Sequence, residues 1–122
     1  MYVVALDHIQ LAMPAGEETR ARDFYSGVLG LPEKLKPPNF AVHGGAWFQN
    51  GSLKVHLGVE KNFTPARKAH PAFTVDDLDG IAALLRDRGY PVIFDEAMPA
   101  TKRLFTEDPF GNRIELIQDV NS

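Results

Sequence analysis

Apolar and polar residues alternate at the start of the chain, over residues 3–13, and this alternation predicts a β-strand. Pro14-Ala15-Gly16 then interrupts the pattern. Glu17 and Glu18 open a helix, because acidic side chains favour the positive end of the helix dipole. The helix has one apolar side, made by Phe24, Tyr25, Val28 and Leu29. Gly30 follows as its C-terminal cap.

Three shorter extended runs follow this helix. They span residues 33–36, 42–49 and 52–60. Asn50-Gly51, between the last two runs, is a strong signal for a tight hairpin. The first half of the chain is therefore predicted to fold in the order strand, helix and three strands.

The second half repeats this order. Residues 70–75 form a predicted strand, and Asp76 or Asp77 caps the helix that follows. The apolar stripe of that helix consists of Leu78, Ile81, Ala82 and Leu85. Gly89 ends the helix, and three extended runs at 91–95, 102–106 and 112–118 complete the half.

Equivalent positions in the two halves are 59 residues apart. This spacing separates Gly30 from Gly89 and His56 from Glu115. Such a repeat of one structural plan predicts two similar modules. We expect an α+β fold of two βαβββ modules, residues 1–64 and 69–122, within one domain. The boundary between the modules falls within residues 61–68.

Four candidate metal ligands fall on the strand faces that no helix covers. Side chains alternate between the two faces of a strand, so the polar residues of an amphipathic strand lie opposite its apolar ones. This alternation places His8, His56, His70 and Glu115 on the helix-free faces of four strands, two in each module. Taken alone, each is more often a solvated polar residue, whereas the joint pattern indicates a site. Imidazoles and a carboxylate suit zinc, iron(II), nickel, cobalt or manganese. The fourth histidine, His43, has no counterpart in the other module and is interpreted as a loop residue.

Composition excludes several classes of protein. The chain of 122 residues has 13 Lys and Arg against 16 Asp and Glu, a formal charge of −3 that gives no footprint for nucleic acid or anionic lipid. Cysteine is absent, which excludes disulfides, thiolate nucleophiles and cysteine-based metal sites. The apolar stretches are too short to span a membrane and no signal peptide is evident, so we expect a cytoplasmic location.

Four motifs resemble those of the vicinal-oxygen-chelate superfamily. They are Asp7-His8-Ile9, Phe24-Tyr25-Ser26-Gly27-Val28-Leu29-Gly30-Leu31, His70-Pro71-Ala72-Phe73-Thr74-Val75 and Asp108-Pro109-Phe110-Gly111-Asn112-Arg113-Ile114-Glu115-Leu116. This superfamily includes glyoxalase I, bleomycin- and fosfomycin-resistance proteins, methylmalonyl-CoA epimerase and extradiol dioxygenases. The resemblance implies two βαβββ modules that form a cupped, eight-stranded mixed sheet around a divalent metal ion.

The resemblance also implies the ligands of that ion, which come from the first and fourth strands of each module. Those positions are His8, His56, His70 and Glu115. Where the glyoxalase I pattern has a second glutamate, this chain has His56, which weakens the case for a two-glutamate proton shuttle. If His56 does not bind the metal, the remaining three residues resemble the two-histidine, one-carboxylate triad of extradiol dioxygenases and fosfomycin transferases.

Several residues are candidates for the chemistry. A bound metal ion polarises a carbonyl or chelates vicinal oxygens and stabilises an enolate or oxyanion. Glu115 is the first candidate for the general base and His56 the second. Arg103, on the strand before the last hairpin, is the candidate for binding a substrate carboxylate or phosphate, with a surface arginine as the alternative. Of Trp47 and Phe48, one is expected to face the helix and the other the cup.

Two functions remain open. The first is a metal-dependent glyoxalase-like enzyme, a lyase, isomerase or dioxygenase, that acts on a small carbonyl, 2-oxoaldehyde adduct or diol. The second is a metal-independent protein that binds and sequesters a small molecule, as bleomycin-resistance proteins do. Four residues placed for a metal favour the enzyme. Exposed sheet edges and the habit of the resembled family predict a homodimer.

Overall fold

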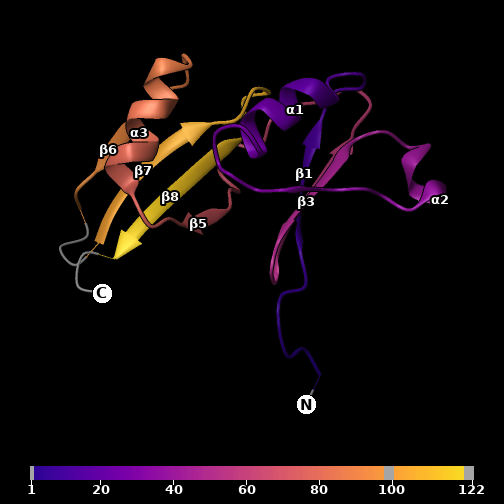
Figure 1. Cartoon of the computed structure of the whole chain (residues 1–122), viewed down its shortest axis with the longest axis horizontal. Helices are drawn as coiled ribbons and strands as arrows, with labels where there is room; N and C mark the ends of the chain where they lie inside the picture. The colour runs from indigo at the N-terminus through magenta and orange to yellow at the C-terminus, as the bar shows by residue number, and fades with distance from the viewer. Residues whose placement is uncertain (1, 98–100, 120–122) are drawn as a thin grey trace. The chain divides into compact units, whose positions relative to one another are not determined.

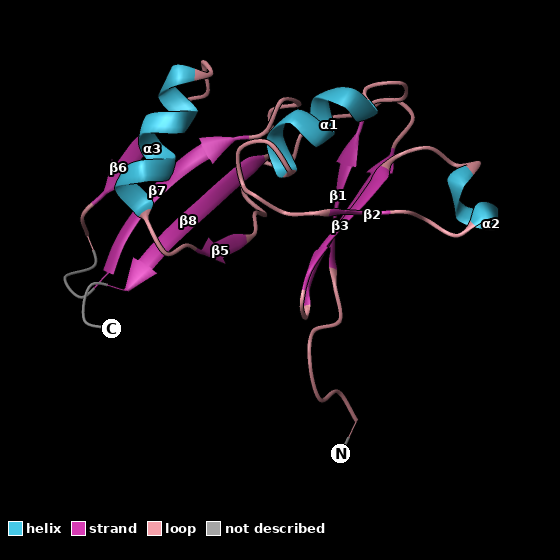
Figure 2. Cartoon of the chain, in the orientation of Figure 1, coloured by secondary structure: helices cyan, strands magenta, loops and turns pink. Residues whose placement is uncertain are grey.

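The computed structural model describes residues 2–97 and 101–119, and the chain divides into two compact units, residues 1–64 (unit 1) and 65–122 (unit 2). Each unit contains one four-stranded sheet and a helix that packs on it (Figures 1 and 2). No helix in the described part of the chain is long and apolar enough to cross a membrane.

Unit 1 follows the predicted order, with one insertion. Its elements are β1 (Ile9–Met13), α1 (Glu18–Tyr25), β2 (Glu33–Lys34), α2 (Pro38–Ala41), β3 (Ala46–Asn50) and β4 (Leu53–Val59). The strand order is β1-β4-β3-β2, with β1 parallel to β4 and the other pairs antiparallel. The buried face of the sheet packs on α1, where Tyr25 stacks on Phe48 at 5.5 Å between ring centroids.

Unit 2 repeats the topology. Its elements are β5 (Ala72–Thr74), α3 (Leu78–Asp87), β6 (Ile93–Asp95), β7 (Thr101–Glu107) and β8 (Arg113–Asp119), and its strand order is β5-β8-β7-β6. Asp77 caps α3 by accepting a hydrogen bond from the Gly80 amide at 3.0 Å, which decides between the two predicted caps. Three residues of the predicted apolar stripe are buried: Leu78, Ala82 and Leu85. The α+β class and the two βαβββ modules are thus confirmed.

The structure corrects two predicted strands. The strand predicted over residues 3–13 begins only at Ile9. Ile9 pairs with Val55, two residues after the start of β4, so the residues before Asp7 lie beyond the hairpin that joins β3 to β4. Without a neighbouring strand they cannot form a ladder. The strand predicted over residues 42–49 begins at Ala46, because the short helix α2 and a turn occupy the preceding residues.

Candidate functional site

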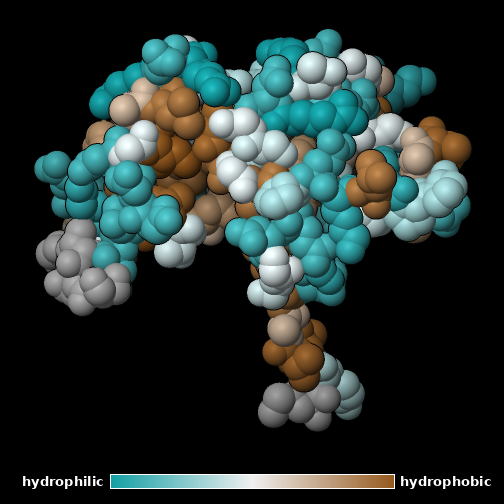
Figure 3. Space-filling view, in the orientation of Figure 1, coloured by the Kyte–Doolittle hydropathy of each residue, from teal (hydrophilic) through white to brown (hydrophobic). Residues whose placement is uncertain are grey.

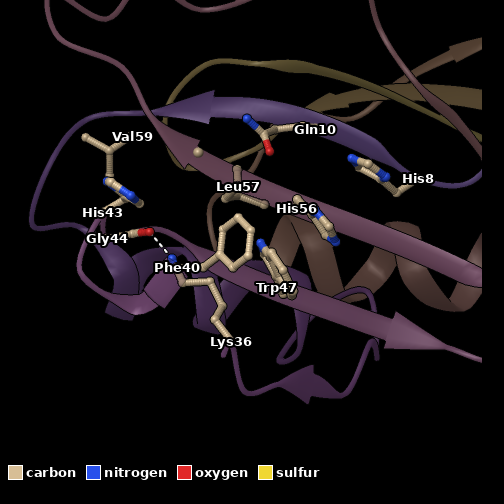
Figure 4. Close-up of a pocket in the computed structure, with 11 residues that line it drawn as sticks. His8, Gln10, Lys36, Phe40, His43, Gly44, Trp47, His56, Leu57 and Val59 are labelled. Atoms are coloured by element: carbon tan, nitrogen blue, oxygen red, sulfur yellow. Dashed lines mark hydrogen bonds between the residues drawn. The ribbon is translucent and has the colours of Figure 1, made fainter. Parts of the chain in front are cut away.

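Four aromatic rings line the face of the unit 1 sheet opposite α1, three of them stacked and the fourth tilted (Figure 4). His56 lies on β4 opposite Trp47 of β3, and the two rings are parallel within 8° at 4.2 Å between centroids. The other face of His56 stacks on His8 at 4.3 Å, and Phe40 of α2 extends the column beyond Trp47 at 5.5 Å. Phe48 is fully buried under the helix, so the predicted division between Trp47 and Phe48 is confirmed.

This column borders a pocket of about 480 Å³. Its wall includes Gln10 of β1, Lys36 and His43 of the β2–β3 connection, and the aromatic column itself. Lys36 donates a hydrogen bond to the Gly44 carbonyl (Figure 4). His43 lies in a loop as predicted, but its place in the pocket wall was not foreseen, because loop conformation carries no periodic signal in the sequence.

Gly45 lets this loop approach the sheet. Its φ is +81°, and a Cβ atom there would lie 2.1 Å from the Leu57 carbonyl oxygen. The amide of Gly45 also donates to a carboxylate oxygen of Glu18 at 2.9 Å, which ties the loop to α1. Only glycine combines this backbone conformation with so close an approach.

The electrostatics of unit 1 favour a neutral His56. Partial burial lowers the pKa of His56 below its ordinary value, and the neighbouring His8 lowers it further. Asp7 accepts from Nδ1 of His8 at 3.0 Å and lies 3.5 Å from Lys54. The hydrogen bond with His8 and the charge of Lys54 lower the pKa of the Asp7 carboxyl. Asp7 therefore fixes the orientation of the His8 ring.

Unit 2 brings its two predicted ligands into contact. Nε2 of His70 lies 2.9 Å from Oε1 of Glu115, and Nδ1 of His70 lies 3.0 Å from the Lys68 carbonyl oxygen. The carbonyl requires a proton on Nδ1, so Nε2 is the nitrogen presented to the carboxylate. Glu115 is only 6% exposed although it lies on the face opposite the helix. The contact with His70 explains part of that burial.

Arg103 is a second polar partner of Glu115. Its Nη1 donates to Oε2 of Glu115 at 3.2 Å, and its Nη2 donates to Oδ2 of Asp95 at 2.6 Å. The hydrogen bonds with Asp95 and Glu115 raise the pKa of the guanidinium. A bond from the Ala97 amide, together with Arg103, lowers the pKa of the Asp95 carboxyl. The residue expected to bind a substrate anion thus already has two carboxylate partners.

The four predicted ligands therefore occur as two pairs, His8 with His56 in unit 1 and His70 with Glu115 in unit 2. Taken by itself, neither unit gathers three or more histidine or acidic side chains that could hold a metal ion, as far as its residues are described. The complete four-residue set stays a prediction.

Comparison with known proteins places this arrangement in a family. The model of the Glyoxalase/Bleomycin resistance protein/Dioxygenase superfamily matches residues 5–116. The chain belongs to this superfamily. Curated proteins give no match. A solved structure from Bacillus anthracis, assigned to the glyoxalase family, is 44% identical, covers 98% of both chains and superposes with a TM-score of 0.91.

Solved structures of lower sequence identity share the fold. A lactoylglutathione lyase from Agrobacterium tumefaciens is 23% identical, with a TM-score of 0.65 over 90% of this chain and 91% of its own. An antibiotic-binding protein from a Streptomyces species is 24% identical, with a TM-score of 0.71 over 98% of both chains. At these identities the likeness establishes the fold alone.

Proposed function

We propose that this superfamily member is a metal-dependent enzyme acting on a small oxygen-chelating substrate, with His70 and Glu115 at the centre of its metal site. The observation that carries the proposal is the 2.9 Å separation between Nε2 of His70 and Oε1 of Glu115. Ligand nitrogen and oxygen atoms lie about 2.0–2.2 Å from zinc, so two neighbouring ligands of one ion are about 3 Å apart. The bond from Nδ1 of His70 to the Lys68 carbonyl is the usual support for a histidine ligand.

The donor set fits a divalent ion of zinc, iron(II), nickel, cobalt or manganese. We propose His8 as the third protein ligand, as predicted from the sequence. We propose His56 as the fourth ligand, also as predicted from the sequence. Trp47 and His8 cover the two faces of its ring, whereas an imidazole binds a metal ion through a nitrogen in the ring plane, so the stack orients the ring without blocking that nitrogen.

Glu115 and Arg103 have different roles in the proposed reaction. When bound, the metal ion polarises a substrate oxygen as a Lewis acid. Glu115 moves the proton next to the polarised group, and its burial keeps bulk water from the carboxylate. Arg103 positions Glu115 by holding Oε2, which leaves Oε1 directed at Nε2 of His70.

The test is the turnover of Glu115→Gln with each metal supplied. The substrates to screen are 2-oxoaldehyde–thiol adducts, catechols and acyl thioesters. Glutamine keeps the shape of the side chain and an oxygen for Arg103 but cannot act as the base, so turnover should fall on the order of 10²–10⁴-fold. Glu96→Gln, at an exposed position after β6, is the matched control and should match the wild type. Equal turnover in Glu115→Gln and the wild type would remove Glu115 from the mechanism.

One observation favours the second function, metal-independent binding of an apolar small molecule. The pocket of unit 1 exposes the aromatic rings of Phe40 and Trp47. Trp47 is the single tryptophan of the chain, so its fluorescence reports occupancy of this pocket directly. Tight binding of an apolar ligand in the presence of a chelator, with no turnover of any substrate, would show that the protein sequesters its ligand and is not an enzyme of the proposed kind.

We also propose a homodimer in the cytoplasm, with residues 2–6 as the arm that pairs with a second copy. These residues are strongly β-forming and apolar, and their exposure ranges from 99% at Tyr2 to 78% at Leu6. Figure 3 shows the arm as an apolar extension of its unit. An unpaired apolar strand is a template for another chain. Pairing it would also fix His8, two residues beyond its end.

A further inference from the structure

The helix-free face of unit 2 carries a second cluster beside His70 and Glu115, and Phe105 of β7 is its centre. The guanidinium carbon of Arg113 lies 4.0 Å from the centroid of the Phe105 ring. The His70 ring meets the same phenylalanine edge-on at 5.6 Å, and Phe105 is the cross-strand partner of Glu115. Phe105, Arg113 and Glu115 therefore lie on one face of β7 and β8, the long strands of unit 2 in Figure 2, and His70 borders them.

Arg113 presents an unused guanidinium on this surface. Its side chain makes no hydrogen bond or ion pair with any residue that the structure describes, whereas both terminal nitrogens of Arg103 bind carboxylates. Stacking on Phe105 fixes the plane of the guanidinium and leaves its N–H edge free to donate. Arg113 thus has the property that the sequence suggested for Arg103.

A small pocket of about 140 Å³ adjoins this guanidinium. Arg67 and Glu107 also line it, with Phe105 and Ile93 as apolar walls. Nη2 of Arg67 lies 3.7 Å from Oε2 of Glu107, too far for a hydrogen bond. Two arginines against one carboxylate leave the pocket with a net positive charge. Since a water molecule takes about 30 Å³ in the liquid, the volume suits a group of only a few heavy atoms.

We propose that Arg113 and Arg67 form a subsite for an anionic oxygen group, a carboxylate or a phosphate, carried by the substrate. Residues two apart on a strand share a face and are about 7 Å apart, which relates Arg113 to Glu115 on β8. The substrate class is therefore a compact organic anion whose reacting carbonyl or hydroxyl lies a few bonds from its anionic group. The placement of the reacting group rests on the proposed function, whereas the anion subsite does not.

The experiment is an NMR titration of the metal-free protein at constant ionic strength, observing the backbone amide resonances of Arg67 and Glu107, which line the pocket in every variant, and in the wild type also the Nε–H resonance of Arg113. Acetate and inorganic phosphate are the anionic probes, and acetamide is the neutral control. We expect saturable shifts with at least one anion and none with acetamide, and the stronger anion identifies the preferred group. Arg113→Gln should weaken the binding at least roughly tenfold, and Arg113→Lys should weaken it less, because lysine keeps the charge but not the fork of donors.

Arg86→Gln is the matched control. Arg86 also lies over a phenylalanine of unit 2, 5.7 Å from the Phe94 ring centroid, but it does not line the pocket. Anion shifts that fail to saturate, or that respond equally to Arg113→Gln and Arg86→Gln, would overturn the subsite. Metal content is measured on separate aliquots of the same protein after reconstitution with each candidate ion. A wild type that binds the anion but no metal would refute the metal-dependent function and leave the subsite standing.

Discussion

Nη1 of Arg103 holds Oε2 of Glu115 at 3.2 Å, while the other carboxylate oxygen, Oε1, faces Nε2 of His70. The two oxygens of Glu115 therefore have separate tasks. Oε2 is anchored to a neighbouring strand, and Oε1 is directed at the histidine. We propose on this basis that Arg103 positions Glu115; the sequence suggested Arg103 as a residue that binds substrate, and that role stays a prediction.

Removing this anchor should weaken metal binding. Partners that orient a ligand typically contribute 10–100-fold in metal affinity, so we expect Arg103→Gln to lose about that much, with partial rescue in Arg103→Lys. Isothermal titration of the apoprotein with the preferred metal measures the effect, and Arg86→Gln serves as the control. Tighter binding in Arg103→Gln would mean that Arg103 competes with the ion instead of positioning its ligand.

The stacked position of His56 predicts a titration below its ordinary pKa of about 6.5. The folded state then binds fewer protons than the unfolded state as the pH falls below 6.5, so the free energy of unfolding should decrease there. The stability contributed by the neutral His56 ring is fully present above pH 6.5. It is lost as the pH falls through the pKa of His56 in the folded state. Imidazole NMR resonances of His56 give the midpoint directly.

Two variants separate the causes of this shift. Trp47→Leu exposes the His56 ring and should raise its pKa more than His8→Gln, because burial is the larger cause and the charge of His8 the smaller. His43→Gln changes a histidine of the same pocket that is absent from the column and should leave the midpoint in place. A midpoint of the His56 titration at or above pH 6.5 in the wild type would contradict the burial of His56 between Trp47 and His8.

Gly45 offers a stability prediction with an internal control. Both Gly45 and Gly51 have positive φ angles, of +81° and +61°, so alanine is strained at either position by about 1 kcal/mol. Only at Gly45 would the new Cβ meet a backbone atom, the Leu57 carbonyl oxygen. Urea unfolding should therefore show a clearly larger loss for Gly45→Ala than for Gly51→Ala. Equal losses would show that the β2–β3 connection does not pack as described.

The apolar arm predicts the oligomeric state. Sedimentation equilibrium should show a dimer for the wild type and a monomer for the double variant Val3→Lys, Val4→Lys, because lysine cannot be buried unpaired in a strand interface. Val42→Lys replaces an equally apolar valine, 79% exposed and outside the arm, and should remain dimeric. A monomeric wild type, or an unchanged dimer in the double variant, would refute the role of the arm.

Strand periodicity predicted the elements and faces well. The alternation that assigned His56 to the open face, and Trp47 and Phe48 to opposite faces, holds because one face of the sheet packs under a helix. Which of Trp47 and Phe48 is buried came from the structure. Periodicity could not show that β1 starts at Ile9, because a strand forms only where a partner runs beside it. It also missed α2 and the pocket wall at Lys36 and His43, which depend on loop conformation.

The sequence anticipated that His70 and Glu115 share a face but not the contacts of the candidate site. The sequence placed His70 and Glu115 on one face, and the parallel pairing of β5 with β8 brings them together. The partners of Arg103 and Arg113 depend on which guanidinium reaches which carboxylate across neighbouring strands. Residue spacing along one strand does not determine such a choice, so only the structure distinguishes the two arginines.

The metal content of the reconstituted protein tests the central claim most directly. Elemental analysis after dialysis should find about one divalent ion per chain in the wild type and in His43→Ala, whose histidine lies outside the proposed ligand set. His70→Ala should lose most of that metal while circular dichroism shows that it remains folded, whereas Glu115→Gln, which keeps an oxygen ligand, should retain part of it. A wild type without bound metal after reconstitution with each candidate ion, or a fully loaded His70→Ala, would contradict the account.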